Sequence, residues 1–319
     1  MQEKIKIYDN ITIGIIVRNE EKTLPFTLSY LLEQSYPIKD FCEIIIADGN
    51  STDRTKEVAE NILKKLWISY KILNERNFID KKWVWYGHSR WRNVILMHTN
   101  PESTYIAWID GDCRADKDRL MSLWKILKDN NNPKVAWAWG TRFVETQWDD
   151  ISTKELTLNY YFTSNIISLG NPAFTAKENI ITIPSVAGYN SIFKKEIFEQ
   201  YKYDSTYPFN TDDLEMNFRL SKQWYTFLYA KDATIYHRWE DTISWFLKQM
   251  KNYGKWVAYT MKIHTTPFVR IYAWITLWYI LYTVLSPLLI VISVWYLWVR
   301  WLALVPYFLL LCLSYQKSI

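Results

Sequence analysis

ITIGIIV, residues 11–17, is a continuous apolar run that predicts a strand buried on both faces of a sheet. Further β-rich runs and helical patterns alternate after it. The β-rich runs cover 44–47, 68–73 and 105–109, and the helical patterns cover about 21–33 and the stretch from the turn at 48–53 to about Lys65. This alternation predicts an α/β fold with a parallel sheet. Because such sheets bind ligands beyond the carboxyl ends of their strands, the residues that follow each run are candidate site residues.

The composition predicts one large α/β domain with an appendage, in a chain of 319 residues of which 49% are hydrophobic. The net charge of +5 is spread along the chain, which argues against a nucleic-acid partner and suits a membrane surface better. Three widely separated cysteines, Cys42, Cys113 and Cys312, predict neither a zinc site nor a disulfide framework. No apolar segment precedes the first strand, so a secretory signal peptide is not expected.

The C-terminal part predicts a transmembrane region over 271–319 with one or two helices. Residues 271–299 contain no charged side chain, and a bilayer core needs about 20 apolar residues per helix. Four basic residues lie just upstream: Lys251, Lys255, Lys262 and Arg270. By the positive-inside rule they place a catalytic domain of residues 1–245 on the cytoplasmic side of the cytoplasmic membrane, with 246–270 as an amphipathic interface segment. An apolar core helix is the alternative.

Two carboxylates follow the β-rich run that ends at 109. Asp110 and Asp112, in IDGDC, would lie on the same side of an extended turn. Hard oxygen ligands at this spacing suit Mg²⁺ or Mn²⁺ bridging a diphosphate. The alternative is a solvated Asp-Gly-Asp turn that binds nothing.

Two other acidic positions have both a structural and a functional interpretation. Asp48 could accept a hydrogen bond from a nucleobase or ribose, and an Asx turn there would lead to a helix with Ser51 or Thr52 as N-cap. Asp212 and Asp213 open a predicted helix, whose dipole stabilises acidic side chains at its N-terminus. A carboxylate at that place could also take the proton of a hydroxyl that attacks an anomeric carbon.

Together these motifs resemble family 2 glycosyltransferases. Five stretches occur in the family's order: IVRNEEKTL at 16–24, ADGNSTDRT at 47–55, RWRN at 90–93, WIDGDC at 108–113 and DDLEMNFRL at 212–220. The resemblance covers about residues 10–256, and it looks closest to bacterial membrane-anchored enzymes of succinoglycan and other exopolysaccharide synthesis. It implies a GT-A fold, which is a Rossmann-like α/β fold for nucleotide-diphospho-sugar transferases, followed by the C-terminal transmembrane segment.

The resemblance also implies roles in donor binding. Asp48 would contact the base and ribose, and Arg18 and Glu20 would line the nucleotide pocket beyond the first strand. Arg92 would lie near the diphosphate, and Asp110 would contact the nucleotide sugar.

Metal and catalytic roles follow from the same resemblance. Asp110 and Asp112 match the family's metal-binding DxD motif, for Mg²⁺ or Mn²⁺. Asp213 matches the catalytic base of a Glu-Asp pair in which Asp212 replaces the glutamate. His237, in IYHR, matches a position that touches the metal or diphosphate in some GT-A enzymes, although an isolated histidine is more often structural.

The implied reaction is inverting transfer of a sugar from a nucleotide-diphosphate sugar to a hydroxyl of a lipid-linked glycan, in cell-envelope or exopolysaccharide synthesis. Membrane lipid is an expected partner and nucleic acid is not. Asn252 and Tyr253 stand where processive synthases carry Gln-x-x-Arg-Trp, which favours transfer of a single sugar. The alternatives are a polyprenyl-phosphate glycosyltransferase and a non-catalytic membrane protein that binds nucleotide sugars.

Glycine and tryptophan usage is unusual. The 8 glycines are about 2.5% of the chain, against about 7% ordinarily, whereas there are 18 tryptophans. Trp224 lies between a predicted helix and strand, where a left-handed residue is normally glycine. Other tryptophans also stand where glycine is expected: Trp91, Trp137, Trp139, Trp239 and Trp256. We hypothesise that the gene uses UGA for glycine and was translated with UGA read as tryptophan. The alternative is an aromatic-rich membrane protein whose C-terminal tryptophans form an interfacial belt.

Overall fold

The computed structural model describes residues 8–74, 78, 88–145, 180–183, 186–207 and 212–238, and beyond these only 291–296 and isolated positions between 248 and 285. The chain divides into two compact units, Met1–Trp256 and Val257–Ile319. The domain boundaries predicted after residues 245 and 270 stay predictions.

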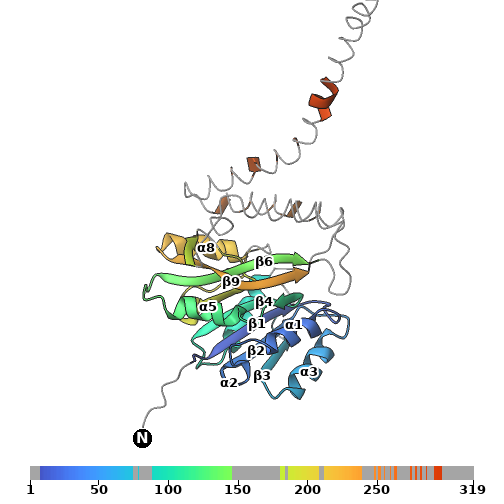
Figure 1. Cartoon of the computed structure of the whole chain (residues 1–319), viewed down its shortest axis with the longest axis vertical. Helices are drawn as coiled ribbons and strands as arrows, with labels where there is room; N and C mark the ends of the chain where they lie inside the picture. The colour runs from blue at the N-terminus through green and yellow to red at the C-terminus, as the bar shows by residue number, and fades with distance from the viewer. Residues whose placement is uncertain are drawn as a thin grey trace, which may run out of the picture. The chain divides into compact units, whose positions relative to one another are not determined.

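The first unit alternates strands and helices over most of its described length (Figure 1). Its strands are β1 (Ile11–Val17), β2 (Cys42–Asp48), β3 (Ser69–Asn74), β4 (Tyr105–Asp110), β5 (Cys113–Ala115), β6 (Val135–Glu145), β7 (Ile180–Ile183), β8 (Ser191–Lys194) and β9 (Thr226–Arg238). Its helices are α1 (Leu24–Leu32), α2 (Ile38–Phe41), α3 (Thr55–Lys65), α4 (His88–His98), α5 (Arg119–Lys128), α7 (Lys195–Gln200) and α8 (Asp212–Lys222).

The described strands form one nine-stranded sheet in the order β3-β2-β1-β4-β8-β6-β9-β5, with β7 paired to β9. Strands β3, β2, β1 and β4 are parallel, which confirms the sheet predicted from the first half of the chain. Strand β8 joins β4 in the antiparallel direction, while β6 and β9 are parallel to each other. The sheet is therefore mixed.

Helices cover both faces of the sheet, because alternate residues of its central strands point to opposite faces. In β2, Ile44 and Ile46 belong to one apolar core, and Ile45 and Ala47 belong to the other. The first core includes apolar side chains of α1, α3 and α5, and the second includes those of α4, α7 and α8. The first unit is thus a three-layer α/β/α domain.

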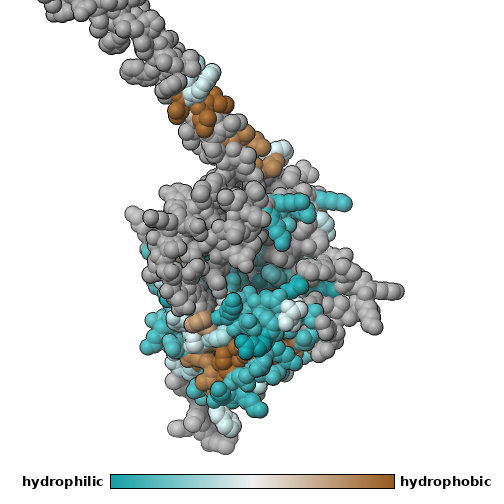
Figure 2. Space-filling view, turned by 90° about the vertical axis from the view of Figure 1, so that its right-hand side faces the viewer, coloured by the Kyte–Doolittle hydropathy of each residue, from teal (hydrophilic) through white to brown (hydrophobic). Residues whose placement is uncertain are grey.

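The second unit is described only at isolated helical positions and at 291–296, so most of the predicted transmembrane region, 271–319, lies outside the described residues. The amphipathic segment predicted at 246–270 is likewise described only in part. Among the described residues, no helix is long and apolar enough to cross a membrane. Many of the described side chains of this unit are large and exposed, and its aliphatic ones are brown in Figure 2. The exposed residues are Trp274, Leu277, Trp278, Leu281, Leu285, Val291, Ile292, Val294, Trp295 and Tyr296.

Candidate active site

Three of the predicted site segments meet at one edge of the sheet. Val17, the last residue of β1, pairs with Asp48 of β2, and Ile16 pairs with Asp110 of β4. Because the three strands are parallel, their carboxyl ends coincide, and the loop that begins at Arg18 starts between the two carboxylates. Arg18 itself is exposed at this edge.

Asp48 bonds to the backbone of the turn that follows β2. Its Oδ1 accepts hydrogen bonds from the Ser51 backbone N–H at 3.1 Å and from the Ser51 hydroxyl at 2.5 Å. Asn74 donates to Oδ2 at 3.4 Å, and the Asp48 side chain is buried. An Asx-type turn was predicted, and the Asp48 side chain does bond the turn backbone, although at the third residue on rather than the second. The predicted helix N-cap at Ser51 or Thr52 is wrong, since α3 begins only at Thr55. The contact of Asp48 with a nucleotide stays a prediction.

The Asp110–Asp112 turn packs tightly on the end of β1. A Cβ added at Gly111 would lie 2.7 Å from Val17 Cγ1 and 3.6 Å from Glu20 Cγ, so this position must lack a side chain. Glu20, predicted to line the nucleotide pocket, therefore lies beside the predicted metal-binding turn, and its carboxylate accepts a hydrogen bond from Thr23.

Helix α1 fixes the same turn from the other side. The hydroxyl of Thr27, which is fully buried, donates to the Gly111 carbonyl at 2.8 Å and accepts from the Cys113 backbone N–H at 3.1 Å. One side chain thus clamps the backbone on both sides of Asp112. No local motif predicts this contact, because Thr27 lies 84 residues before Gly111.

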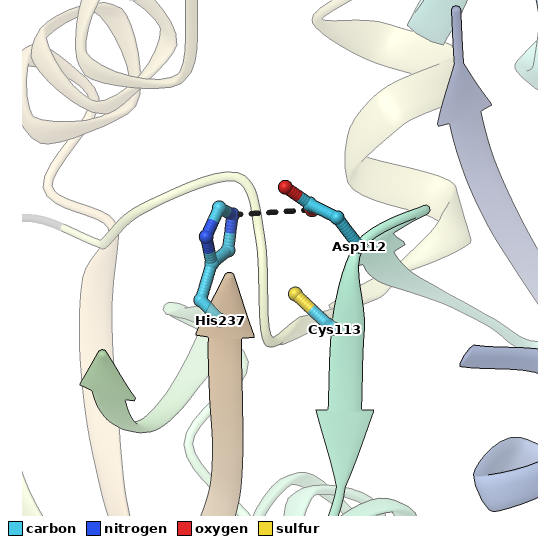
Figure 3. Close-up of side chains that lie close together, drawn as sticks. All are labelled: Asp112, Cys113 and His237. Atoms are coloured by element: carbon cyan, nitrogen blue, oxygen red, sulfur yellow. Dashed lines mark ion pairs between the residues drawn. The ribbon is translucent and has the colours of Figure 1, made fainter. Parts of the chain in front are cut away.

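His237 lies against both carboxylates of the turn. Strand β5 pairs with β9 so that Cys113 is opposite His237. His237 Nε2 is 3.1 Å from Asp110 Oδ2 and 3.5 Å from Asp112 Oδ1. Figure 3 shows Asp112, Cys113 and His237 pointing toward one another, and their ligand atoms all lie within 4.8 Å. The structure therefore brings the three predicted metal ligands together and adds Cys113, which the sequence analysis did not consider as a ligand.

These side chains fit a hard divalent cation. Burial opposes the charge on Asp110 and His237, but their mutual hydrogen bond lowers the pKa of Asp110, and the charge of Asp112 and the hydrogen bond to Asp110 raise the pKa of His237. Burial raises the pKa of the Cys113 thiol to about 11, so it is neutral near pH 7. Carboxylate oxygens are the ligands that suit Mg²⁺ or Mn²⁺, whereas a neutral thiol does not suit either ion. Asp110, Asp112 and His237 would hold such an ion.

A buried ion pair lies at the start of α8. Arg92 Nε is 3.1 Å from Asp212 Oδ2, and the two side chains are 6% and 1% exposed. The guanidinium carbon also lies 4.9 Å from the centre of the Trp108 ring. Arg92 was predicted near the diphosphate, but the structure gives its charge a partner inside the protein. A contact with the diphosphate stays a prediction.

Gly188 connects this ion pair to Asp213. Its backbone N–H donates to Asp213 Oδ2 at 2.7 Å, and its carbonyl accepts from Arg92 Nη1 at 3.0 Å. A Cβ added at Gly188 would lie 2.2 Å from Arg92 Nη2, so only glycine fits between the two side chains. Arg92 therefore holds the residue whose amide orients Asp213.

The surroundings raise the pKa of Asp213 to about 6, through burial first and then the charge of Asp212, against the opposing effect of Arg92. Asp213 is half-buried as a residue, whereas Asp212 is only 1% exposed. Asp110 and Asp213 both lie close enough to Arg92 and to His88 to shift the pKa of each. Two of the acidic clusters thus converge on one place, together with His88, a lone histidine that the sequence analysis did not single out.

The protein family described as glycosyl transferase family 2 has a sequence model that matches residues 12–202, which is more than half of the chain. The chain belongs to this family. As a family 2 glycosyltransferase it is an enzyme, and the predicted enzyme class is confirmed.

Two characterised proteins are similar to this glycosyltransferase in sequence. "Minor teichoic acid biosynthesis protein GgaA" of Bacillus subtilis is 26% identical over 125 residues, which are 39% of this chain and 26% of GgaA, so the match spans about a quarter of that protein. A Methanococcus voltae enzyme, "Dolichyl N-acetyl-alpha-D-glucosaminyl phosphate 3-beta-D-2,3-diacetamido-2,3-dideoxy-beta-D-glucuronosyltransferase", is 24% identical over 253 residues, covering 76% of this chain and 71% of that one.

Solved structures support a GT-A-like fold. The mannosyltransferase PcManGT of Pyrobaculum calidifontis, in complex with GDP-Man and Mn²⁺, superimposes with a TM-score of 0.58 at 16% identity, over 82% of this chain and 67% of that one. TarS of S. aureus with UDP-GlcNAc gives a TM-score of 0.50 at 13% identity, over 73% and 59% of the chains. The predicted α/β nucleotide-sugar transferase fold is confirmed, while the roles of the individual site residues stay predictions.

Proposed function

We propose that this glycosyltransferase moves one sugar from a nucleotide-diphosphate sugar to a hydroxyl group of a lipid-linked glycan, with inversion at the anomeric carbon, in cell-envelope or exopolysaccharide synthesis. Asp213 acts as the base, and Asp110, Asp112 and His237 hold Mg²⁺ or Mn²⁺. One observation carries this proposal: Asp213 is a partly exposed carboxylate with a pKa of about 6, oriented by the Gly188 amide and close to the same arginine as Asp110.

In the proposed reaction the acceptor hydroxyl gives its proton to Asp213 while its oxygen forms a bond to the anomeric carbon. The bond between that carbon and the diphosphate oxygen breaks, and its electron pair leaves with the diphosphate. Because the attack and the departure occur on opposite faces of the sugar, the configuration inverts. A bound divalent cation would neutralise charge on the leaving diphosphate.

A pKa of about 6 suits Asp213 for this task. A carboxylate with the ordinary pKa of 3.8 is a weaker proton acceptor, whereas one far above 7 would be protonated at neutral pH. Asp212 cannot replace it, because its carboxylate is buried against Arg92. The two adjacent carboxylates therefore have different roles: Asp212 is the structural partner of Arg92, and Asp213 is the base.

The similar proteins support the donor and acceptor classes. PcManGT is described with GDP-Man and TarS with UDP-GlcNAc, so proteins of this fold bind nucleotide-diphosphate sugars. The name of the Methanococcus voltae enzyme contains a dolichyl phosphate-linked sugar, and GgaA is named for teichoic acid synthesis. A lipid-linked or envelope glycan as acceptor is consistent with both names.

A location at the cytoplasmic membrane, with the catalytic unit in the cytoplasm, is part of the proposal. It is supported by the uncharged stretch at 271–299 and by the exposed apolar side chains of the second unit. Fractionation of cells that produce the full chain tests it. Recovery of the enzyme in the soluble fraction, without detergent, would argue against membrane attachment.

Asp213→Asn tests the base. We expect transfer to fall about 10²- to 10⁴-fold, the range typical of a lost general base, while donor binding stays near that of the wild type. Asp40→Asn, an exposed aspartate on α2, is the matched control and should leave transfer unchanged. The assay uses detergent-solubilised full-length enzyme with a panel of nucleotide sugars, and NMR of the product gives its anomeric configuration.

Two outcomes would contradict parts of the proposal. Full transfer by Asp213→Asn to a lipid phosphate would indicate the polyprenyl-phosphate alternative, in which the acceptor needs little help from a base. Retained configuration in the product would exclude direct displacement. Asp112→Ala tests the metal ligands separately, because it should weaken only the part of donor binding that depends on Mg²⁺ or Mn²⁺.

A further inference from the structure

Two tryptophans adopt a backbone conformation that large side chains rarely take. Among the described residues, five residues other than glycine have positive φ: Asn19, Asn50, Trp67, Asn190 and Trp224. Three are asparagines, which tolerate the left-handed region because their short polar side chain bonds locally. The other two are tryptophans, with φ of 56° at Trp67 and 65° at Trp224.

Trp224 occupies the glycine position of a Schellman motif at the end of α8. The Trp224 N–H donates to the Ser221 carbonyl at 3.0 Å, and the Tyr225 N–H donates to the Leu220 carbonyl at 3.1 Å. Leu220 and Tyr225 pack in the same apolar core, which is the hydrophobic contact that accompanies this motif. The motif needs a left-handed residue between them, and this residue is usually glycine.

Trp67 stands at the corresponding place after α3. The Leu66 N–H donates to the Leu63 carbonyl at 3.2 Å and closes the last turn. Leu63 and Ile68 then pack in one core on either side of Trp67. Both helices thus end with a tryptophan at positive φ, where the backbone favours glycine.

Neither indole gains contacts that would offset the strain. Trp67 is 93% exposed and Trp224 is 82% exposed. Trp124 differs in every respect: it is 6% exposed, its indole N–H donates to Asp9 at 2.9 Å, and its ring packs edge-on against Tyr36 with centroids 5.3 Å apart. Trp124 therefore has the environment expected of a tryptophan, whereas Trp67 and Trp224 do not.

The composition points the same way. Ordinary glycine usage of about 7% would give about 22 glycines in 319 residues, about 14 more than the 8 present. The chain has 18 tryptophans. The excess of tryptophan is therefore large enough to account for the missing glycines. A crowded pair in the core is a further misfit, since the rings of Trp137 and Phe193 lie 3.4 Å apart between centroids, below the usual 4.5–7 Å.

We infer that residues 67 and 224 are glycine in the native protein, because their codons are UGA and the source cell inserts glycine at UGA. Position 124 is tryptophan, encoded by UGG. This inference is independent of the proposed function, since it rests on backbone conformation and composition alone.

Peptides from the native protein decide the matter. Trypsin cleaves after Lys65, Arg119 and Lys222, so positions 67, 124 and 224 fall in the separate peptides 66–71, 120–125 and 223–231. We expect mass spectrometry to find glycine at 67 and 224 and tryptophan at 124. Tryptophan at 67 and 224 in the native protein, or UGG codons at these two positions in the gene, would overturn the inference.

The conformational argument can be tested with recombinant protein of the printed sequence. Trp67→Gly and Trp224→Gly should each raise the Tm by about 2–4 °C, since a residue with a Cβ is strained in the left-handed conformation. Trp→Ala at the same sites keeps the Cβ and should recover less, while Trp124→Gly should lower the Tm. Equal Tm values for the glycine and alanine variants would remove the conformational basis of the inference.

Discussion

The ion pair between Arg92 and Asp212 gives the sharpest test of how the site is held. Arg92→Met removes the charge but keeps a long apolar side chain against Trp108 and Tyr203, whose rings lie under the guanidinium. The Asp212 carboxylate is 1% exposed, and burial already raises its pKa. Without Arg92 it would be an unpaired buried acid. Breaking a buried pair in this way typically costs about 3–5 kcal/mol.

That cost is a large part of the 5–15 kcal/mol by which a domain is usually stable. For a unit of this size it corresponds to a Tm lower by about 6–20 °C. The double variant Arg92→Met/Asp212→Leu removes both charges, and exchange of a buried pair for apolar residues is often nearly neutral. We therefore expect the double variant to regain most of the lost stability in guanidinium unfolding.

Activity should behave differently from stability in this series. The double variant restores the fold but not the hydrogen bond from Arg92 to the Gly188 carbonyl, so Asp213 stays poorly oriented. In the double variant, sugar transfer should remain low, whereas donor binding should be closer to that of the wild type than in Arg92→Met. An Arg92→Met variant as stable as the wild type would refute the cost assigned to the unpaired Asp212, and full transfer by the double variant would refute the coupling through Gly188.

Three further predictions concern the same site. Asp212→Asn removes a charge that raises the pKa of Asp213. Because the proposed base must be deprotonated, the fall of kcat/KM at acid pH, which lies near pH 6 in the wild type, should move to lower pH. An unchanged pH profile would contradict the assignment of Asp213 as the base. Thr27→Val leaves a buried carbonyl and N–H without their partner, so it should lower stability by about 1–3 kcal/mol and raise the KM for donor, whereas an unchanged KM would argue against the clamp. Gly188→Ala brings a Cβ within 2.2 Å of the guanidinium of Arg92, so single-turnover transfer should fall more than donor affinity measured by calorimetry; equal losses in both would indicate general unfolding.

The sequence was sufficient for the parallel half of the fold. The run at Ile11–Val17 predicted β1 with its bounds, and the positions of Asp48 and Asp110 at strand ends followed from the alternation of strands and helices. This worked because a strand buried on both faces has an unmistakable apolar run. The antiparallel strands were harder: β5 has three residues, and its pairing with β9 depends on a contact more than 100 residues away.

The acidic residues of the candidate site were predicted from the sequence, but the residues that position them were not. Acidic motifs are local, so Asp110, Asp112 and Asp213 could be named from short stretches. Cys113, Thr27 and the Gly188 peptide act through contacts between distant segments, and a single sequence carries no local signal for them. Arg92 illustrates the limit, because its place in RWRN marked it as a site residue while only the structure gave it Asp212 as a partner.

The buried ion pair between Arg92 and Asp212 is better explained by the way it positions Asp213 than by a contribution to the stability of the fold. Exchange for apolar residues would often cost nothing, so a buried arginine and aspartate are weak evidence of a stabilising role. Their placement is specific, however: Arg92 pairs with Asp212 and also bonds the carbonyl of the peptide whose N–H bonds Asp213. Neighbouring residues of a helix point about 100° apart, so fixing Asp212 inside the protein also fixes the direction in which the Asp213 side chain points. If Asp213 is the proposed base, the pair would orient it, at a place where a flexible carboxylate would lose the proton-accepting geometry.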